Sequence, residues 1–186
     1  MVPRPALLPG APSLPRVIEP HIRRAEPRDG DAMYRLELAS IHSAWREYYD
    51  GTQIQAWCQA LHPTYRRDAQ SVRELLVAEQ EGRVVAFGQL HPRRARIEAL
   101  YAAPGHMRRG LGQSLLRCLE RTAWNLGMEA LDVTASLCAV PFYRAAGYVE
   151  QGPWDFEFGE VRVPALLMKK HRPSPHPLPF RRSPWT

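Results

Sequence analysis

The order of elements predicted for this chain favours an α/β fold, with a mixed, mostly antiparallel central sheet flanked by helices. Three hydrophobic stretches, at 74–79, 83–91 and 93–103, follow one another closely and predict a meander of neighbouring strands. A long amphipathic helix then leads to a fourth apolar stretch at 130–135. This order is neither a strict strand–helix alternation nor an all-β pattern. We therefore expect antiparallel neighbours that are joined to later strands through helical crossovers.

One strand and two helices are predicted before the meander. Residues 17–25 are predicted to form the strand. Acidic residues in its first turn mark a helix over about 28–48. A second helix is expected from Thr52 and must stop before Pro63, because the residue preceding a proline disfavours helical backbone.

After the meander, helices and strands alternate. The amphipathic helix is predicted over 111–126, with its apolar residues on one stripe, and a short helix over 139–146. A strand is expected to begin at Tyr148, and a last strand over 160–169 with an interruption around Pro164.

The chain length of 186 residues is that of one domain with a substantial core. We expect this domain to span residues 18–170. Residues 1–17 are rich in proline without a period and are predicted to be a disordered tail. Residues 171–186, rich in proline and arginine, are predicted to be a second disordered tail.

The formal net charge of +6 suggests nucleic-acid binding, but the distribution of the charge argues against it. The two tails hold five arginines and no acidic residue, which leaves about +1 for residues 18–170. The remaining basic residues that stand out form a local cluster: Arg93, Arg94, Arg96, Arg108 and Arg109. Such a cluster suits a phosphorylated ligand better than a surface that follows DNA.

Compartment and metal content follow from what the chain lacks. No apolar run is long enough to span a bilayer, and prolines interrupt the N-terminal residues where a signal peptide would lie. We therefore expect a cytoplasmic protein without membrane contact. Cys58, Cys118 and Cys138 are odd in number and lack the spacing of metal ligands, so we expect reduced thiols and no metal.

The most informative stretch joins the third meander strand to the amphipathic helix. Residues 102–116 read Ala-Ala-Pro-Gly-His-Met-Arg-Arg-Gly-Leu-Gly-Gln-Ser-Leu-Leu. The N-terminus of a helix presents free N–H groups that hold phosphate. Gly110 and Gly112 allow the backbone to approach a pyrophosphate, and Arg108 and Arg109 add charge and forked donors. This loop is therefore predicted to bind a phosphorylated ligand.

Two familiar phosphate loops do not fit this stretch. A Walker loop requires a lysine after its last glycine, and Gln113 stands there. A dinucleotide fingerprint requires a third glycine where Leu115 stands. The segment Met107 to Gly112 instead resembles the acyl-CoA-binding loop of the GCN5-related N-acetyltransferase (GNAT) superfamily, Gln/Arg-x-x-Gly-x-Gly/Ala. Met107 departs at the first position, to which family members contribute backbone.

A second stretch strengthens this resemblance. Residues 136–148 read Ser-Leu-Cys-Ala-Val-Pro-Phe-Tyr-Arg-Ala-Ala-Gly-Tyr. The family pattern is Asn-x-x-Ala-x-x-Phe-Tyr-x-x-x-Gly-Phe, and this chain departs only at Ser136 and Tyr148. The resemblance implies a small bacterial acetyltransferase, the GNAT fold for residues 18–170, and acetyl-CoA as co-substrate. The residues it implies for cofactor binding are Leu100, Tyr101, Ala102, Met107, Arg108, Arg109, Gly110, Leu111, Gly112, Gln113, Ser114 and Ser136.

The resemblance also implies two catalytic residues. Tyr143 occupies the position of the acid that protonates the departing thiolate, a role that suits a phenol. Alternatively, Tyr143 packs on the cofactor or only orients its sulfur. Glu98 lies in an apolar strand before the cofactor loop, where many members carry an acid, and is the candidate base or substrate-binding acid. Alternatively, it is a structural acid paired with Arg94 or Arg96.

The acceptor is expected to bind near the first two helices. His42, Tyr49 and Trp57 are candidates for an aromatic pocket, although helix spacing also suits Trp57 for the core and His42 for the surface. We expect acetyl transfer to the primary amine of a small molecule by direct attack in a ternary complex. The alternatives are a protein lysine or N-terminus, a non-catalytic acyl-CoA sensor, or an interaction protein that acts through its tails. Nucleic-acid binding is not expected, and the late strands leave a homodimer open.

Overall fold

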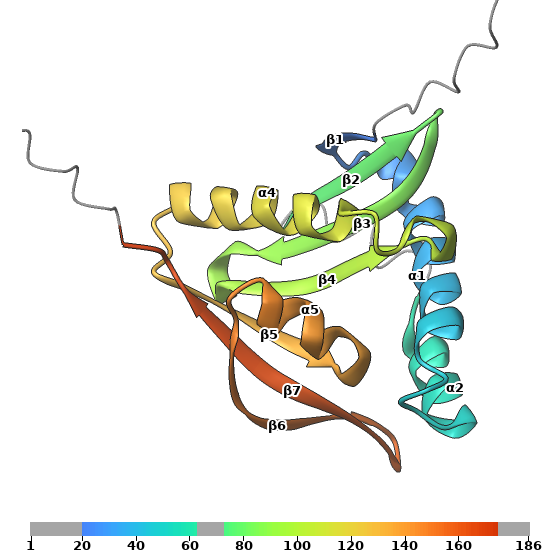
Figure 1. Ribbon diagram of the computed structural model, residues 1–186. Coiled ribbons are helices and arrows are strands. Elements are labelled where there is room, and N and C mark those ends of the chain that lie inside the picture. The colour runs from blue at the N-terminus through green and yellow to red at the C-terminus, as the bar shows by residue number, and fades with distance from the viewer. Residues whose placement is uncertain (1–19, 63–72, 175–186) are drawn as a thin grey trace, which may run out of the picture.

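The computed structural model describes residues 20–62 and 73–174 (Figure 1). The predicted tail at 1–17 lies outside these residues, as do residues 175–186 of the second predicted tail and the predicted start of the first strand. The described part of the chain is interrupted between residues 62 and 73.

A single seven-stranded sheet, in the order β1-β2-β3-β4-β5-β7-β6, forms the centre of the molecule. All neighbouring strands run antiparallel except β4 and β5, which confirms the predicted mixed, mostly antiparallel sheet. The strands are β1 (His21–Arg24), β2 (Glu74–Gln80), β3 (Arg83–His91), β4 (Arg96–Ala102), β5 (Ala130–Ser136), β6 (Val149–Phe158) and β7 (Val161–His171).

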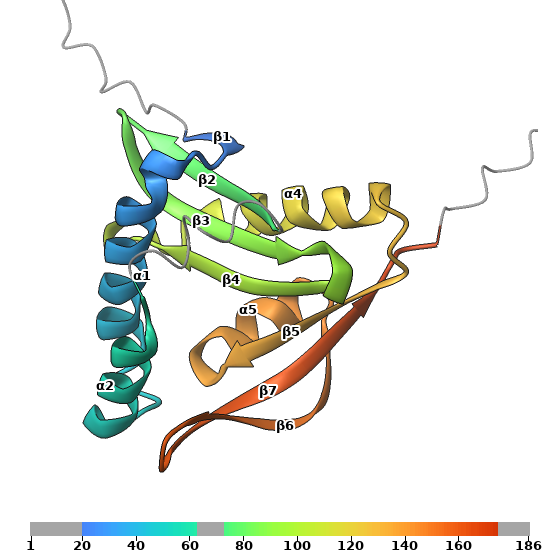
Figure 2. The ribbon, with the colours of Figure 1, turned by 180° about the vertical axis from the view of Figure 1, so that it is seen from behind.

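Helices cover both faces of this sheet. α4 (Leu111–Asn125) and α5 (Val140–Ala145) lie in front of it in Figure 1, and α1 (Gly30–Ala44) and α2 (Gly51–Ala60) lie on the other face, seen in Figure 2. Short 3₁₀ turns precede α1, connect β3 to β4, and occupy Pro104–His106 and Leu137–Ala139.

The apolar stripe of α4 explains how that helix packs on the sheet. Leu115, Leu116 and Leu119 are at most 1% exposed. The sheet residue beneath them is Gly88, where an added Cβ would lie 2.8 Å from Leu119 Cδ1. Because that distance is shorter than a normal carbon contact, glycine allows α4 to lie close to β3. The loop before α4 is thereby held against the sheet.

Two sequence predictions were wrong, the end of α1 and the interruption of β7, and in both cases tertiary packing gives the reason. α1 ends at Ala44 and not near residue 48, and Trp45 then turns inward to the core at 3% exposure. β7 runs without interruption through Pro164, which pairs with Asp155 of β6. On its other side β5 reaches only as far as Ala165, so no strand there requires an N–H from residue 164.

The pairing of β4 with β5 is unusually short. These parallel strands share only two pairs, Arg96 with Asp132 and Ile97 with Val133, and then diverge (Figure 1). α1 packs on the β3–β4 side of the gap, and α2 packs on the β6–β7 side. The helix pair therefore bridges the two halves of the sheet.

The described residues, 20–62 and 73–174, contain neither a membrane-spanning helix nor a cluster of metal ligands. Within them, no helix has both the length and the apolar character needed to cross a membrane. Nor do these residues place three His, Cys, Asp or Glu side chains together as a metal site. Cys58, Cys118 and Cys138 are free thiols.

Candidate active site

Two adjoining cavities fill the gap between β4 and β5. The larger, of about 430 Å³, extends to the loop before α4, and the smaller, of about 100 Å³, extends toward Glu98 and Thr134. We call the two cavities together the slot. The residues that line both of its parts are Trp45, Leu100, Tyr101, Ser136, Ala139 and Tyr143.

The loop before α4 forms one end of the slot. Gly110 is the N-cap of α4 and has φ +81°, a left-handed conformation that favours glycine, and it offers no side chain to cap the helix. The N–H of Ser114 donates to the Gly110 carbonyl at 3.0 Å and makes the first turn of the helix. The N–H groups of the preceding residues, 111–113, therefore have no carbonyl within the helix and are available to an anion.

Most of the residues predicted to bind the cofactor meet in the larger cavity. They are Leu100, Tyr101, Ala102, Met107, Arg108, Gly110, Gly112, Gln113 and Ser136. Arg109 and Ser114 do not line it, and Leu111 is buried in the core behind it. Arg109 and Ser114 therefore stand outside this cavity, and the side chain of Leu111 is not available to a ligand there.

The structure adds lining residues that the sequence argument missed. Ser40, Ala44 and Trp45 come from the end of α1, and Phe142 comes from α5. Phe142 lies in the second quoted motif, so its position could have been read from that pattern. The three residues from α1 belong to no motif, because they reach the slot only through packing of α1 across the sheet.

Tyr143 lies at the junction of the two cavities. Its side chain is buried, with 5% of the residue exposed, and it packs edge-on against Phe142 and Tyr148. Burial, assisted by the negative charge of Glu120, raises the pKa of the Tyr143 phenol well above its ordinary value. The phenol therefore carries its proton at neutral pH.

Glu98 faces the smaller cavity from a bulge in β4. Leu90 pairs with Ile97 and Gln89 with Ala99, so Glu98 is the extra residue of this strand. Its Oε2 accepts hydrogen bonds from Arg73 Nε and Gln89 Nε2, both at 2.6 Å. The partner is Arg73, and not Arg94 or Arg96 as the structural alternative expected.

The charge state of Glu98 follows from these contacts. Burial alone would raise the pKa of the Glu98 carboxyl, but the hydrogen bonds from Arg73 and Gln89 outweigh burial and hold that pKa below its ordinary value. Glu98 is therefore ionised at neutral pH. Within the described residues, both of its hydrogen bonds fall on Oε2, and none reaches Oε1.

Of the three predicted acceptor residues, only Trp57 reaches the slot. It lines the smaller cavity and packs edge-on against Trp45 and Phe156, with ring centroids 4.8 and 4.5 Å away. Its indole N–H is buried and finds no acceptor in the part of the chain that the structure describes. His42 and Tyr49 instead line a separate depression beside α1 and α2, where His42 Nε2 lies 3.8 Å from Cys58 Sγ.

The Tyr49 hydroxyl joins two backbone groups that are distant in the sequence, those of Pro164 and Leu137. This hydroxyl donates to the Pro164 carbonyl at 2.8 Å and accepts from the Leu137 N–H at 2.7 Å. Burial raises the pKa of Tyr49 to about 12, although the Leu137 N–H acts in the opposite direction. The observed contacts thus tie the turn between α1 and α2 to β7 and to the end of β5.

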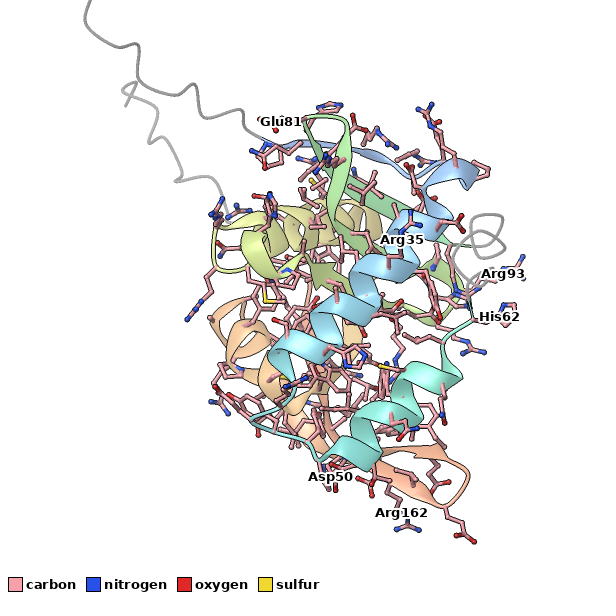
Figure 3. All side chains as sticks on the ribbon, turned by 90° about the vertical axis from the view of Figure 1, so that its right-hand side faces the viewer. Arg35, Asp50, His62, Glu81, Arg93 and Arg162 are labelled. Carbon is pink, nitrogen blue, oxygen red and sulfur yellow. The ribbon has the colours of Figure 1, made fainter. Side chains whose placement is uncertain are left out.

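The predicted arginine cluster separates into two groups in space. Arg108 and Arg109 precede α4, while Arg93, Arg94 and Arg96 lie at the other end of β4. A strand of this length spans about 20 Å, so one phosphate group cannot contact both groups. Figure 3 shows Arg93 and His62 at one edge of the molecule, away from the yellow-green loop that leads into α4.

Comparison with known proteins identifies the family. Residues 46–171 match the family model described as the acetyltransferase (GNAT) domain. The chain belongs to the GNAT acetyltransferases. This assignment confirms the resemblance seen in the sequence and the fold class that it implied.

Solved structures agree with the GNAT fold. A GCN5-related N-acetyltransferase from Rhodopseudomonas palustris is 27% identical, with a TM-score of 0.78 over 84% of this chain and 98% of that one. PaiA N-acetyltransferase from Thermoplasma acidophilum, in complex with coenzyme A, is 17% identical, with a TM-score of 0.66 over 83% and 100%. YncA from Salmonella typhimurium, with acetyl-CoA, is 19% identical, with a TM-score of 0.57 over 86% and 99%.

The hydroxyl of Tyr49 provides a test of how the slot is held together. We expect Tyr49→Phe to lower the free energy of unfolding by about 2 kcal/mol, because the Pro164 carbonyl and the Leu137 N–H lose their partner. For a domain of this size the melting temperature should fall by about 4–8 °C. Tyr48→Phe is the matched control, since Tyr48 is 46% exposed. Equal melting temperatures for the two variants would contradict the structural role of Tyr49.

Proposed function

We propose that this GNAT protein transfers the acetyl group of acetyl-CoA to the primary amine of a small molecule, by direct attack in a ternary complex. The observation that carries the proposal is the slot, which brings Tyr143 to the junction of its two cavities and Glu98 to the smaller one. A cofactor entering from α4 and an acceptor entering beside Glu98 would meet next to Tyr143. The coenzyme A and acetyl-CoA present in two related structures support this choice of cofactor.

The larger cavity offers groups for the pyrophosphate and for the pantetheine chain of acetyl-CoA. The free N–H groups at 111–113, together with Arg108 and Arg109, would hold the pyrophosphate. The pantetheine chain would lie between Leu100–Ala102 and Ser136, which line the same cavity. Because β4 pairs with β5 only at residues 96 and 97, backbone groups farther along β4 have no β5 partner and can stabilise the developing oxyanion.

The proposed reaction uses two groups on opposite sides of the thioester. The amine nitrogen attacks the thioester carbon, and the tetrahedral intermediate collapses by breaking the C–S bond. Tyr143 donates its proton to the departing thiolate, and the second amine proton, released as the amide forms, restores the phenol through water. Glu98 is ionised, and its Oε1 accepts no hydrogen bond from the described residues; it holds the acceptor's ammonium and takes its proton, directly or through water. A lysine-like amine is otherwise neutral in about one molecule per thousand near pH 7.4.

The size of the smaller cavity favours a small acceptor. A volume of about 100 Å³, walled by Trp45, Trp57 and Phe156, accommodates an amine and a short carbon chain. The proposal therefore assigns acceptor contact to Trp57 and does not include His42 or Tyr49, whose side chains line the separate depression.

Cofactor binding can be tested by thermal stability. At about 100 times its Kd a ligand stabilises the folded state by roughly 2.7 kcal/mol, which corresponds to about 5–10 °C for this domain. We expect that shift with acetyl-CoA and with CoA, and a much smaller one with ADP, which lacks the pantetheine chain. The absence of a shift with all three ligands would contradict the cofactor assignment.

The role of Tyr143 can be tested with a neighbouring tyrosine as the control. Tyr143→Phe should lower kcat by about 100-fold or more, since a positioned proton donor contributes roughly 10²–10⁴-fold. Tyr148→Phe removes a hydroxyl from the ring packed against Tyr143 but outside the slot, and should retain most of the activity. If Tyr143→Phe turned over as fast as the parent protein, Tyr143 would not be the acid.

The proposed role of Glu98 predicts how kcat depends on pH. Its carboxyl has a lowered pKa, so it stays ionised as the pH falls toward 5, and kcat should vary little between pH 6 and 8. In Glu98→Gln the acceptor must lose its proton unaided, so kcat should fall about 100-fold at pH 7 and rise nearly tenfold per pH unit. Stopped assays of thiol release across this range measure both profiles. Parallel profiles would leave Glu98 only its structural contact with Arg73.

A further inference from the structure

The group of arginines at the Glu98 end of β4 lies at the opposite end of that strand from the loop before α4. Arg96 differs from its neighbours because its side chain is fixed in place. Its Nη2 donates to Thr134 Oγ1, and its guanidinium lies 5.7 Å from the centre of the Trp154 ring. These two contacts hold a half-buried cation at a defined position on the face of the sheet that carries α1 and α2.

This cation has no acidic partner in the part of the chain that the structure describes. The two nearest acids along the strands are already occupied. Asp132, opposite Arg96 in the β4–β5 pair, is 3.3 Å from Lys169 Nζ, and Glu98 is 2.6 Å from Arg73 Nε. A guanidinium carries five N–H donors in a planar fork, and Thr134 accounts for one of the hydrogen bonds that Arg96 can make.

The location of Arg96 connects it with the acceptor side of the slot. Thr134, which accepts its hydrogen bond, lines the smaller cavity, and so does Glu98, two residues farther along β4. Because β4 is bulged at Glu98, Arg96 and Glu98 lie no farther apart than the roughly 7 Å that separates residues two apart in a regular strand. A second unused donor, the buried N–H of Trp57, belongs to the same cavity. Within the described residues, the acceptor side thus combines a Glu98 oxygen that accepts no hydrogen bond, an Arg96 guanidinium with N–H groups beyond the one bonded to Thr134, and an indole N–H without an acceptor.

We propose that the acceptor is a short-chain amino acid, whose ammonium is bound by Glu98 and whose carboxylate is bound by Arg96. The pairing follows from charge: Glu98 Oε1 suits the reacting amine, and the forked guanidinium suits a carboxylate. The inference rests on the proposed acetyl transfer and deepens it by naming the class of acceptor. Arg96 is a specificity-determining residue in this scheme and takes no part in breaking or making bonds.

Three amines on the same four-carbon chain test the proposal: 4-aminobutanoate, n-butylamine and 1,4-diaminobutane, which end in a carboxylate, a methyl group and a second amine. The parent protein should acetylate 4-aminobutanoate with the highest kcat/KM. Arg96→Gln should lower kcat/KM for 4-aminobutanoate about 10- to 100-fold, the range expected for a lost charged hydrogen bond. The value for n-butylamine should change less than about threefold. Arg96→Lys keeps the positive charge but not the forked geometry of the guanidinium. Its kcat/KM for 4-aminobutanoate should lie between those of the parent protein and of Arg96→Gln.

Arg93→Gln is the matched control, because Arg93 is exposed and its substitution removes the same charge three residues earlier in the chain. It should leave the preference among the three amines unchanged. Each variant is accepted only if its melting temperature and its acetyl-CoA affinity equal those of the parent protein.

Two results would overturn the proposal. One is a parent protein that does not prefer 4-aminobutanoate, and the other is an Arg96→Gln variant that keeps the preference. Calorimetric titration of the three amines into the CoA-saturated protein gives the same comparison where transfer is slow, and equal affinities would also overturn the proposal. Transfer to n-butylamine with no preference would refute only the acceptor class. No transfer to any amine, with no stabilisation by acetyl-CoA, would refute the proposed function itself.

Discussion

The divergence of β4 and β5 after two residue pairs is the constraint on which the candidate site depends. If these two parallel strands continued to pair, their backbone N–H and C=O groups would hydrogen-bond to each other, and no space would remain between the strands. Here the pairing stops at Ile97 and Val133, and the strand ends separate around the slot. The unpaired edge of β4 and the residues that flank the gap are thereby exposed to ligands inside an otherwise continuous sheet.

A gap within a sheet must be held open by packing around it. On one face α4 lies close to β3 over Gly88, and α5 places Tyr143 against the core of the β5 side. On the other face α1 and α2 span the gap, and the Tyr49 hydroxyl bonds the turn between them to β7 and to the residue after β5. These contacts attach both edges of the gap to the same set of helices. The packing of those helices therefore sets the width of the gap.

The divergence also separates the charges of the site. The free N–H groups before α4, with Arg108 and Arg109, form a positive mouth at one end of β4. At the other end Arg73 and Gln89 stabilise the Glu98 carboxylate, while Arg96 is held by Thr134 and Trp154. The length of one strand keeps these two ends apart. The slot therefore has a positive end beside the first turn of α4, and groups of both charges lie near its Glu98 end.

Local sequence determined a large share of this protein. Periodicity and turn residues sufficed for most of the elements, because amphipathic stripes and glycine turns are local properties of the chain. Two contiguous motifs indicated the family and contain seven of the nine predicted cofactor residues that line the larger cavity, since a loop and its following helix bring sequence neighbours together.

Only the tertiary structure decided which distant residues meet. In the structure the partner of Glu98 is Arg73, and not Arg94 or Arg96. The Tyr49 hydroxyl bonds to backbone groups of β7 and Leu137. The end of α1 lines the slot. The tertiary structure also divided one run of arginines between the two ends of a strand. Such contacts depend on how helices and strands pack over long sequence separations, and no local pattern encodes that packing.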